Sequence, residues 1–292
     1  MKRSLSMKLF CSIALVFVIS IMAGYSNANA ADIAVQLAEQ YLKKIPVGQI
    51  DTKMSMEEAI KVQEQFVAIL SRELGEPVGY KAALTNPNVQ KLFGVSHPVR
   101  GTLLQKMILK SGSAIPADFG TRPMSEGDLL VRVGDDGINN AKTHEATLQY
   151  IDAVIPFIEL PDLVYGKDVK LNGPALVAIN AGARYGVAGE PVAVKATPEW
   201  RNRLKTFTLQ IFDEKGLLVT EGTGSSLLDD PLHVILWIKD SLAVEGKKLK
   251  KGDLLSLGSI TKMIPVKSGS IIRAKYIGLD PDVPIEISVS FK

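Results

Sequence analysis

Two stretches near the N-terminus carry hydrophobic residues at helical spacing. In the first, residues 33–42, the apolar side chains form a one-sided stripe, and Asp32 can serve as the N-cap. In the second, Ser55 and Glu58 have the spacing of a capping box, in which each side chain satisfies a free backbone donor. A run of apolar residues follows, and Gly75 has the position of a helix C-terminal glycine. The pattern therefore predicts two N-terminal helices.

From residue 78 onward the sequence changes to short apolar runs separated by glycine, proline and asparagine, which is typical of strands and loops. Strands are predicted over residues 129–133, 206–212, 217–219, 253–257, 270–276 and 284–291. Two helices interrupt them: one runs from near Thr143 toward Ala153, and the other has Asp230 as its cap and ends before Gly246. We therefore expect an α+β fold, with a helical segment over residues 31–77 and one β-rich domain over residues 78–292.

The first thirty residues have the pattern of a secretory signal. A basic start over residues 2–8 precedes an apolar run over residues 9–23, and Ala28-Asn29-Ala30 supplies the small residues of a cleavage site. A retained membrane anchor is the alternative, but the run is shorter than the roughly 20 apolar residues that span a bilayer. We expect cleavage before Ala31, a periplasmic or secreted protein, and no membrane attachment afterwards.

Charge and cysteine content narrow the chemistry. The formal charge of +3 falls to zero without residues 1–30, which carry three basic and no acidic residues, so binding to nucleic acid is not expected. Cleavage also removes Cys11, the only cysteine, and with it any disulfide or thiolate site. The three histidines are scattered along the sequence. A metal would therefore be held by carboxylates, which suit hard cations such as Mg²⁺, Ca²⁺ or Mn²⁺.

Two acidic residues share one face of a predicted strand. Side chains two residues apart point to the same side, so Glu126 and Asp128 lie together, while Gly127, Leu129 and Val131 form the opposite, apolar face. Neighbouring carboxylates repel each other unless a cation lies between them or water surrounds them. Taken alone, the pair is better explained as the solvated start of a strand.

A third acid and a lysine occupy apolar surroundings. Glu159 lies in a nearly continuous hydrophobic run, where an unpaired charge costs several kcal/mol unless a cation or metal compensates it. An ion pair with a lysine or arginine elsewhere is the alternative to a metal. Lys81 lies among small apolar residues in a strand-like setting, where it could also be an edge residue with its ammonium in water.

These segments together resemble the 2-keto-4-pentenoate hydratases of the fumarylacetoacetate hydrolase superfamily, to which the 4-oxalocrotonate decarboxylases are also related. The match runs in order along nearly the whole mature chain. The segments are residues 79–85 (GYKAALT), 92–95 (LFGV), 98–101 (PVRG), 125–131 (SEGDLLV), 154–159 (VIPFIE), 222–224 (GTG), 230–232 (DPL), 252–253 (GD) and 258–261 (GSIT). The resemblance implies a mixed β-sheet roll of the fumarylacetoacetate hydrolase type.

The resemblance also implies a role for each candidate residue. Glu126, Asp128 and Glu159 match the three carboxylates that hold Mg²⁺ or Mn²⁺, and Lys81 matches a catalytic lysine at the pocket wall. Polar positions that bind the substrate are matched by Asn180, Ser259 and Thr261. The chain departs from the family where Asp128 replaces a glutamate, where Leu163 and Val164 follow Asp162, and where Ile179 precedes Asn180.

The function implied is that of a divalent-metal-dependent lyase in aromatic catabolism. It would hydrate a small 2-oxo or 2-hydroxy-dienoic acid such as 2-hydroxypenta-2,4-dienoate, and the resemblance also implies a homo-oligomer. Decarboxylation of a 2-oxo acid and C–C hydrolysis, both within the same superfamily, are alternatives. A secreted relative that binds a carboxylate ligand without catalysis is a further alternative, because of Asp128, the altered segment after Glu159 and the export signal.

Overall fold

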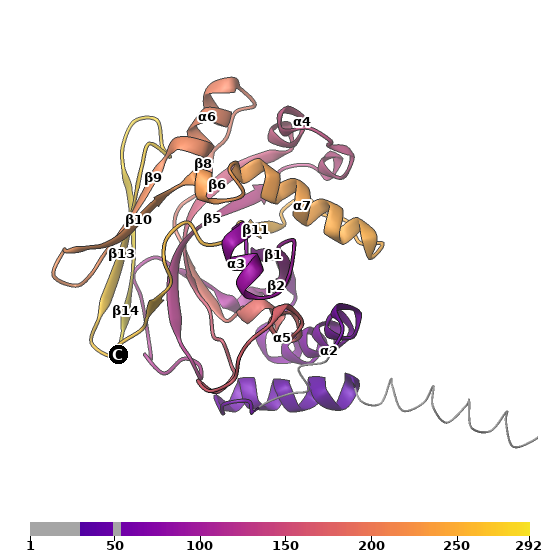
Figure 1. Cartoon of the computed structure of the whole chain (residues 1–292). Helices are drawn as coiled ribbons and strands as arrows, with labels where there is room; N and C mark the ends of the chain where they lie inside the picture. The colour runs from indigo at the N-terminus through magenta and orange to yellow at the C-terminus, as the bar shows by residue number, and fades with distance from the viewer. Residues whose placement is uncertain (1–29, 49–53) are drawn as a thin grey trace, which may run out of the picture.

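Two β-sheets and the helices around them form the molecule (Figure 1). The structure is a computed structural model that describes residues 30–48 and 54–292. The predicted signal sequence, apart from its last residue, lies outside the described residues. Within the described part, both parallel and antiparallel strand pairs occur in each sheet, so the predicted α+β class with mixed sheets is confirmed.

The larger sheet has nine strands in the order β2-β1-β11-β5-β6-β7-β3, with β12 paired to β5 and β8 paired to β6. Its strands are β1 (Pro77–Ala83), β2 (Val99–Leu104), β3 (Ile108–Lys110), β5 (Met124–Val133), β6 (Ile151–Leu160), β7 (Tyr185–Ala188), β8 (Val192–Ala193), β11 (Leu254–Ser256) and β12 (Ile264–Pro265). The two longest, β5 and β6, are antiparallel neighbours. The short strand β11 lies between β1 and β5 and pairs with both.

The smaller sheet has five strands in the order β10-β9-β13-β14-β4. These strands are β4 (Ser113–Ile115), β9 (Thr208–Phe212), β10 (Leu218–Thr223), β13 (Ile271–Ile277) and β14 (Ile285–Phe291). The sequence predicted four of them, including the antiparallel pair β9 and β10 across the turn at residues 214–216. This sheet lies on the left of the molecule in Figure 1.

Helices surround the larger sheet. One helix spans residues 30–43. The others are α2 (Met56–Leu74), α3 (Pro87–Leu92), α4 (His144–Gln149), α5 (Gly173–Ala178), α6 (Pro198–Thr206) and α7 (Pro231–Val244), with short 3₁₀ turns η1 (Gln105–Met107), η2 (Asp136–Asn140), η3 (Asn180–Gly182) and η4 (Gly224–Ser226). Helices α2 and α5 pack together below the sheet in Figure 1. No described helix has the length and apolar character needed to cross a membrane.

Helix ends follow the local sequence in most places. The capping box at Ser55 and Glu58 is present, and Gly75 ends α2 with a positive φ of 85°. Asp230 caps α7 by accepting from the Leu232 N–H group, as expected. Asp32 was expected to be an N-cap and is not, because the preceding alanines already adopt the helical conformation that they favour.

The helix predicted from Thr143 toward Ala153 is shorter than expected. Thr143 does cap α4, but the helix ends at Gln149 and Ile151 begins strand β6. The residues from Ile151 onward pair with β5 and continue the apolar run that leads to Glu159. Tertiary pairing therefore decides the conformation here, because β-branched residues fit the pleated surface better than a further helical turn.

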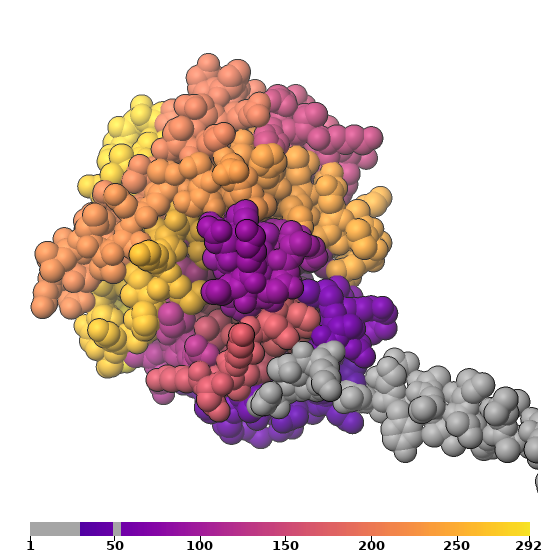
Figure 2. Space-filling model, in the orientation of Figure 1, coloured from indigo at the N-terminus to yellow at the C-terminus, as the bar shows by residue number. Residues whose placement is uncertain are grey.

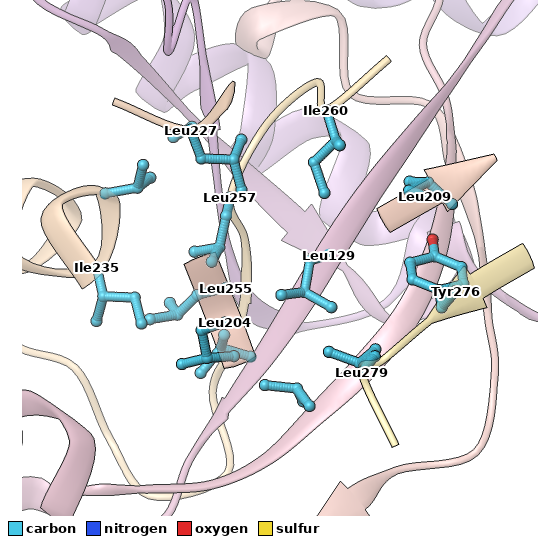
Figure 3. Packing of buried hydrophobic residues seen from close by; sticks show 14 of the residues in the cluster. Leu129, Leu204, Leu209, Leu227, Ile235, Leu255, Leu257, Ile260, Tyr276 and Leu279 are labelled. Carbon is cyan, nitrogen blue, oxygen red and sulfur yellow. The ribbon is translucent and has the colours of Figure 1, made fainter. Parts of the chain in front are cut away.

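The two sides of β5 lie in different environments, as the alternation of acidic and apolar residues predicts. Leu129, Val131 and Val133 belong to the main hydrophobic core, in which Leu129 lies among Leu209, Leu255 and Tyr276 (Figure 3). The opposite face carries Glu126 and Asp128 and continues into a small apolar cluster of Leu130, Phe157, Ile155 and Leu103. The acidic residues are therefore held by a strand whose other face is anchored in the core.

A second core joins the N-terminal helices to the rest of the chain. It contains Leu37 and Tyr41 of the first helix and Phe66 of α2, together with residues of α5 and η3 such as Leu176 and Ala181. The helical segment thus packs directly against the elements that follow β6. Its division from the β-rich part as a separate domain stays a prediction.

Replacement of Leu129 tests whether the face of β5 opposite the acids anchors the strand. Leu129 is fully buried, so we expect Leu129→Ala to lower the free energy of unfolding by about 2–5 kcal/mol, because it leaves a cavity in the core. Urea denaturation measures the change. The matched control is Leu217→Ala, at a leucine that is 62% exposed, which should change the free energy by less than about 0.5 kcal/mol. Equal effects would contradict this assignment of the core.

Candidate metal and substrate site

Glu126 and Glu159 lie directly opposite each other on neighbouring strands. The register of β5 and β6 pairs the two residues, and both side chains are at least 95% buried. Directly opposed residues on antiparallel strands have Cβ atoms about 5 Å apart, so the two carboxylates share one small volume. Like charges at this separation repel strongly when little water is present. The pair therefore needs a compensating cation or proton.

Lys81 of β1 supplies one positive charge. Its side chain is 2% exposed, and its ammonium group forms an ion pair with Oε1 of Glu159. The same ammonium donates a hydrogen bond of 3.1 Å to the carbonyl oxygen of Ala181 in η3. The structure therefore brings Lys81 to the acidic pair predicted from the sequence. Of the two sequence interpretations of Glu159, the structure shows the ion pair with a lysine, and the metal ligand stays a prediction.

The electrostatics of the cluster follow from burial. Burial raises the pKa of Glu126 well above its usual value, and the nearby charge of Glu159 raises it further. The pKa of Asp128 is raised for the same two reasons. Burial alone would lower the pKa of Lys81, but the carboxylates of Glu159 and Glu126 outweigh that effect and raise it. Lys81 therefore remains an ammonium ion, and the raised pKa values favour the protonated forms of Glu126 and Asp128.

Asp128 is held differently from the two glutamates. Its Oδ1 accepts hydrogen bonds from the backbone N–H groups of Leu129 at 2.6 Å and Gly258 at 2.9 Å. Its Oδ2 accepts from the hydroxyl of Ser256 on β11. A glutamate would place its carboxylate about one methylene further from β5, so these contacts depend on the shorter side chain. Asp128 thus joins β5 to β11 next to Lys81, which pairs in register with Ser256.

The three predicted substrate-binding residues have separate environments. Ser259 is exposed, and its side chain lies close enough to Glu126 to lower the pKa of that carboxyl. Thr261 is buried, and its hydroxyl accepts from the backbone N–H of Gly127 at 3.0 Å. Asn180 is fully buried, and its amide bonds the backbone of Thr102 in both directions. Ser259 therefore lies between the acidic cluster and solvent, whereas the other two side chains bond the backbone of neighbouring strands.

Two carboxylate oxygens in the cluster lack a hydrogen-bond partner among the described residues. They are Oε2 of Glu126 and Oε2 of Glu159, one from each member of the opposed pair. Buried carboxylate oxygens are rarely left without a donor, so the arrangement fits a cation ligated by oxygen. Asp128 has a remaining lone pair on Oδ2. Across residues 30–48 and 54–292, however, no three acidic or histidine side chains are gathered as a metal centre.

Two residues of the site were not identified from the sequence. The Tyr276 hydroxyl lies 2.7 Å from both the Asp128 and the Phe157 carbonyl oxygens, and it accepts from the Phe157 N–H group. Burial raises its pKa, so the hydroxyl keeps its proton. Ser256 binds Asp128. Each has a weak sequence signal, since Tyr276 ends an alternating apolar strand and Ser256 interrupts one, but neither signal identifies a partner.

An open pocket beside α3 lies away from the acidic cluster. It measures about 590 Å³ and separates α3 from the loop before α5. Its lining consists of Lys91, Leu92, Phe93, Gly94, Asp168, Val169, Lys170, Leu171 and Asn172. In the space-filling view the segment that contains α3 is central on this face, with α7 above it and the α5 region below (Figure 2). The pocket lining does not include Lys81, Glu126, Asp128 or Glu159.

The raised pKa values predict how the stability of the metal-free protein depends on pH. Acids with a raised folded pKa stabilise the fold fully below their unfolded pKa, which is roughly 4 for Asp and Glu, and this contribution is lost as pH rises through the folded value. We therefore expect the Tm in the presence of EDTA to fall as the pH rises above about 5. Glu126→Gln, which cannot ionise, should reduce the fall.

Thermal unfolding followed by circular dichroism at several pH values measures this difference. The exposed variant Glu73→Gln is the matched control and should retain the wild-type slope. A wild-type Tm that stays constant over this range, or the same slope for Glu126→Gln and wild type, would contradict the proton-bound state of the cluster.

The chain has homologues of known name. It is 28% identical over 259 residues to the TodF product hydratase of Pseudomonas putida, which covers 86% of this chain and 91% of the relative. It is 27% identical over 203 residues to a 2-keto-4-pentenoate hydratase of Paraburkholderia xenovorans, which covers 69% of this chain and 73% of the relative. No protein-family model matches the sequence.

Solved structures show the same fold. A 4-oxalocrotonate decarboxylase from Pseudomonas putida G7, complexed with magnesium and adipate, superposes with a TM-score of 0.79 at 23% identity, covering 91% of this chain and 98% of that one. A fumarylacetoacetate hydrolase family protein from Yersinia pestis gives a TM-score of 0.51 at 13% identity, covering 73% and 92%. The resemblance predicted from the sequence motifs is confirmed: the chain is a homologue of the 2-keto-4-pentenoate hydratases and has the fold of the fumarylacetoacetate hydrolase family.

Proposed function

We propose that the protein is a divalent-metal-dependent hydratase of a small 2-hydroxy-dienoic acid. The observation that carries the proposal is the buried, opposed pair of Glu126 and Glu159, each with an oxygen that lacks a partner, beside the ammonium of Lys81. The relatives named as hydratases support the reaction class. The decarboxylase of the same fold, which was solved as a complex with magnesium and adipate, supports a metal and an acidic ligand.

The residues that would hold Mg²⁺ or Mn²⁺ are Glu126 and Glu159 through their free oxygens, with Asp128 through Oδ2. When bound, the cation would hold the carboxylate and 2-oxygen of the substrate and stabilise negative charge on that oxygen. The chain contributes the shape of this site, because β5 and β6 fix the spacing of the two glutamates. Ser259, which contacts Glu126 from the exposed side, lies where an acidic substrate would meet the cluster.

The reaction is a net addition of water. In 2-hydroxypenta-2,4-dienoate the 2-hydroxyl proton is lost and a proton is gained at C5, which gives a 2-oxo acid with a double bond between C3 and C4. Water then adds its oxygen to C4, and a proton is gained at C3, so that 4-hydroxy-2-oxopentanoate is formed. Each proton transfer needs a group that holds or releases a proton beside the 2-oxo acid.

Lys81 is the residue placed for this role. Its pKa is raised by Glu159 and Glu126 against the effect of burial, so it is protonated at neutral pH and can donate a hydrogen bond to the substrate. Its ammonium is directed by Glu159 and by the Ala181 carbonyl, which restricts a flexible side chain to one position. As a positive charge in a buried site, it also stabilises the anionic enolate that forms as the 2-hydroxyl proton is lost.

Metal binding and turnover can be separated by two variants. We expect Mg²⁺ or Mn²⁺ to stabilise the wild type by roughly 2.7 kcal/mol at a hundredfold excess over its dissociation constant, because the ion binds only the folded site. Glu126→Gln should lose most of this stabilisation. Lys81→Met should keep it, yet lower turnover of 2-hydroxypenta-2,4-dienoate by at least about 100-fold. Thermal shift and the decay of dienoate absorbance are the two measurements.

Two further measurements distinguish the alternative functions. In the first, the protein is titrated with Mg²⁺ and then with pyruvate or oxalate in a calorimeter. Binding of these ligands without turnover of the dienoate would favour a non-catalytic carboxylate-binding protein. Release of CO₂ from 4-oxalocrotonate without hydration would favour the decarboxylase. If neither Mg²⁺ nor Mn²⁺ changes the wild-type Tm, Glu159 serves only as the ion-pair partner of Lys81, and the proposed metal-dependent function is wrong.

We further propose that the chain is exported, with cleavage before Ala31, and that it forms a homo-oligomer. Support for export comes from the basic start, the apolar run and the small residues at 28–30. Protein recovered from the periplasm or medium of the native host should begin at Ala31 when its N-terminus is sequenced. Soluble cytoplasmic protein that retains Met1 would contradict the export proposal. The homo-oligomer rests on the resemblance alone.

A further inference from the structure

The side-chain amide of Asn180 is fully engaged with one residue of strand β2. Its Oδ1 accepts from the Thr102 N–H group at 2.7 Å, and its Nδ2 donates to the Thr102 carbonyl at 2.8 Å. The side chain is completely buried. A group bonded in both directions to one residue's backbone acts as a clamp between η3 and β2. It has little freedom to turn toward a substrate.

The backbone that Asn180 holds is strained. Asn180 and Ala181 have positive φ values of 57° and 52°, followed by Gly182 at 71°. The left-handed conformation is unfavourable for a residue with a Cβ, and asparagine tolerates it better than most residues. Such strain persists only where surrounding contacts maintain it. The two bonds to Thr102 are contacts of that kind.

This strained turn places the carbonyl that directs Lys81. The Ala181 oxygen accepts the 3.1 Å hydrogen bond from the Lys81 ammonium, and Ala181 directly follows Asn180. Strand β2 also borders Lys81, because Gly101 is its register partner. A Cβ at Gly101 would lie 2.5 Å from the Asn180 carbonyl oxygen and 3.0 Å from Cγ of Lys81. Glycine is therefore required where β2, Lys81 and the turn meet.

We propose that Asn180 is a positioning residue for Lys81, which acts through the carbonyl of Ala181 and the clamp on Thr102. This assignment replaces the direct contact with substrate expected from the sequence, and its catalytic consequence rests on the proposed function. The Glu159 carboxylate alone fixes only one of the ammonium hydrogens. The Ala181 carbonyl fixes a second, which sets the rotation of the group and the direction of the third.

Kinetics of two Asn180 variants test the proposal. Asn180→Ala should lower kcat for 2-hydroxypenta-2,4-dienoate by roughly 10- to 100-fold, with KM within about twofold of wild type, because Lys81 is misplaced while substrate contacts remain. The Mg²⁺-dependent rise in Tm should be retained. Asn180→Gly, which adopts positive φ without strain, should show the same loss of kcat and guards against a variant that fails to fold.

A double-mutant cycle shows whether the effect passes through Lys81. In a Lys81→Met background, Asn180→Ala should cause no further loss of kcat, since the residue that it positions is gone. The matched control is Gln63→Ala, which removes another buried side-chain bond to β2, from Gln63 Nε2 to the Arg100 carbonyl at 2.6 Å. It should lower stability without changing kcat. Additive losses of kcat, or a tenfold rise in KM at unchanged kcat, would overturn the proposal.

The double-mutant cycle still tests the positioning role of Asn180 if the proposed function is wrong. A wild type that does not turn over the dienoate refutes the function, and the coupling is then measured in the Tm of the same four proteins. Asn180→Ala should lower the Tm less in the Lys81→Met background than in wild type, because the Ala181 carbonyl has lost its donor. Equal decreases in both backgrounds would overturn the positioning role by itself.

Discussion

The ion pair between Lys81 and Glu159 is the contact on which the acidic cluster depends. Both groups are almost completely buried, where the loss of hydration is offset only by close opposite charge and further hydrogen bonds. Without Lys81, the opposed carboxylates of Glu126 and Glu159 would face each other across two strands with nothing between them. The ion pair therefore allows the fold to keep the two glutamates opposite each other in a buried position.

The sheet makes that contact possible by separating its two faces. Leu129 and its neighbours anchor one side of β5 in the main core, so the strand cannot rotate to expose Glu126 and Asp128. Tyr276 reaches from the smaller sheet to the Asp128 and Phe157 carbonyls, at the point where β5 and β6 pair. Hydrophobic packing on one face thus sets the positions of charged groups on the other, which is the condition for a preorganised site.

How much the sequence predicts depends on the range of the contact. Local rules account for the capping box of α2, the cap of α7 and the alternation of β5, because each acts within a few residues. The resemblance brings Lys81, Glu126 and Glu159 together although 78 residues separate Lys81 from Glu159. Neither approach finds the bonds of Asp128 to β11 or of Asn180 to Thr102, and local propensity places the end of α4 wrongly. Those features depend on which strands become neighbours.

Charge balance explains why Glu126 and Asp128 have raised pKa values. Three carboxylates and one ammonium leave a buried net charge of two negative units when all are ionised, and a low-dielectric site does not tolerate that surplus. Protons can remove it, and the raised pKa values of Glu126 and Asp128 are the response of the metal-free protein. One divalent cation carries the same two charges. Under the proposed function, a bound divalent cation would compete with these protons, and its binding would release them from Glu126 and Asp128.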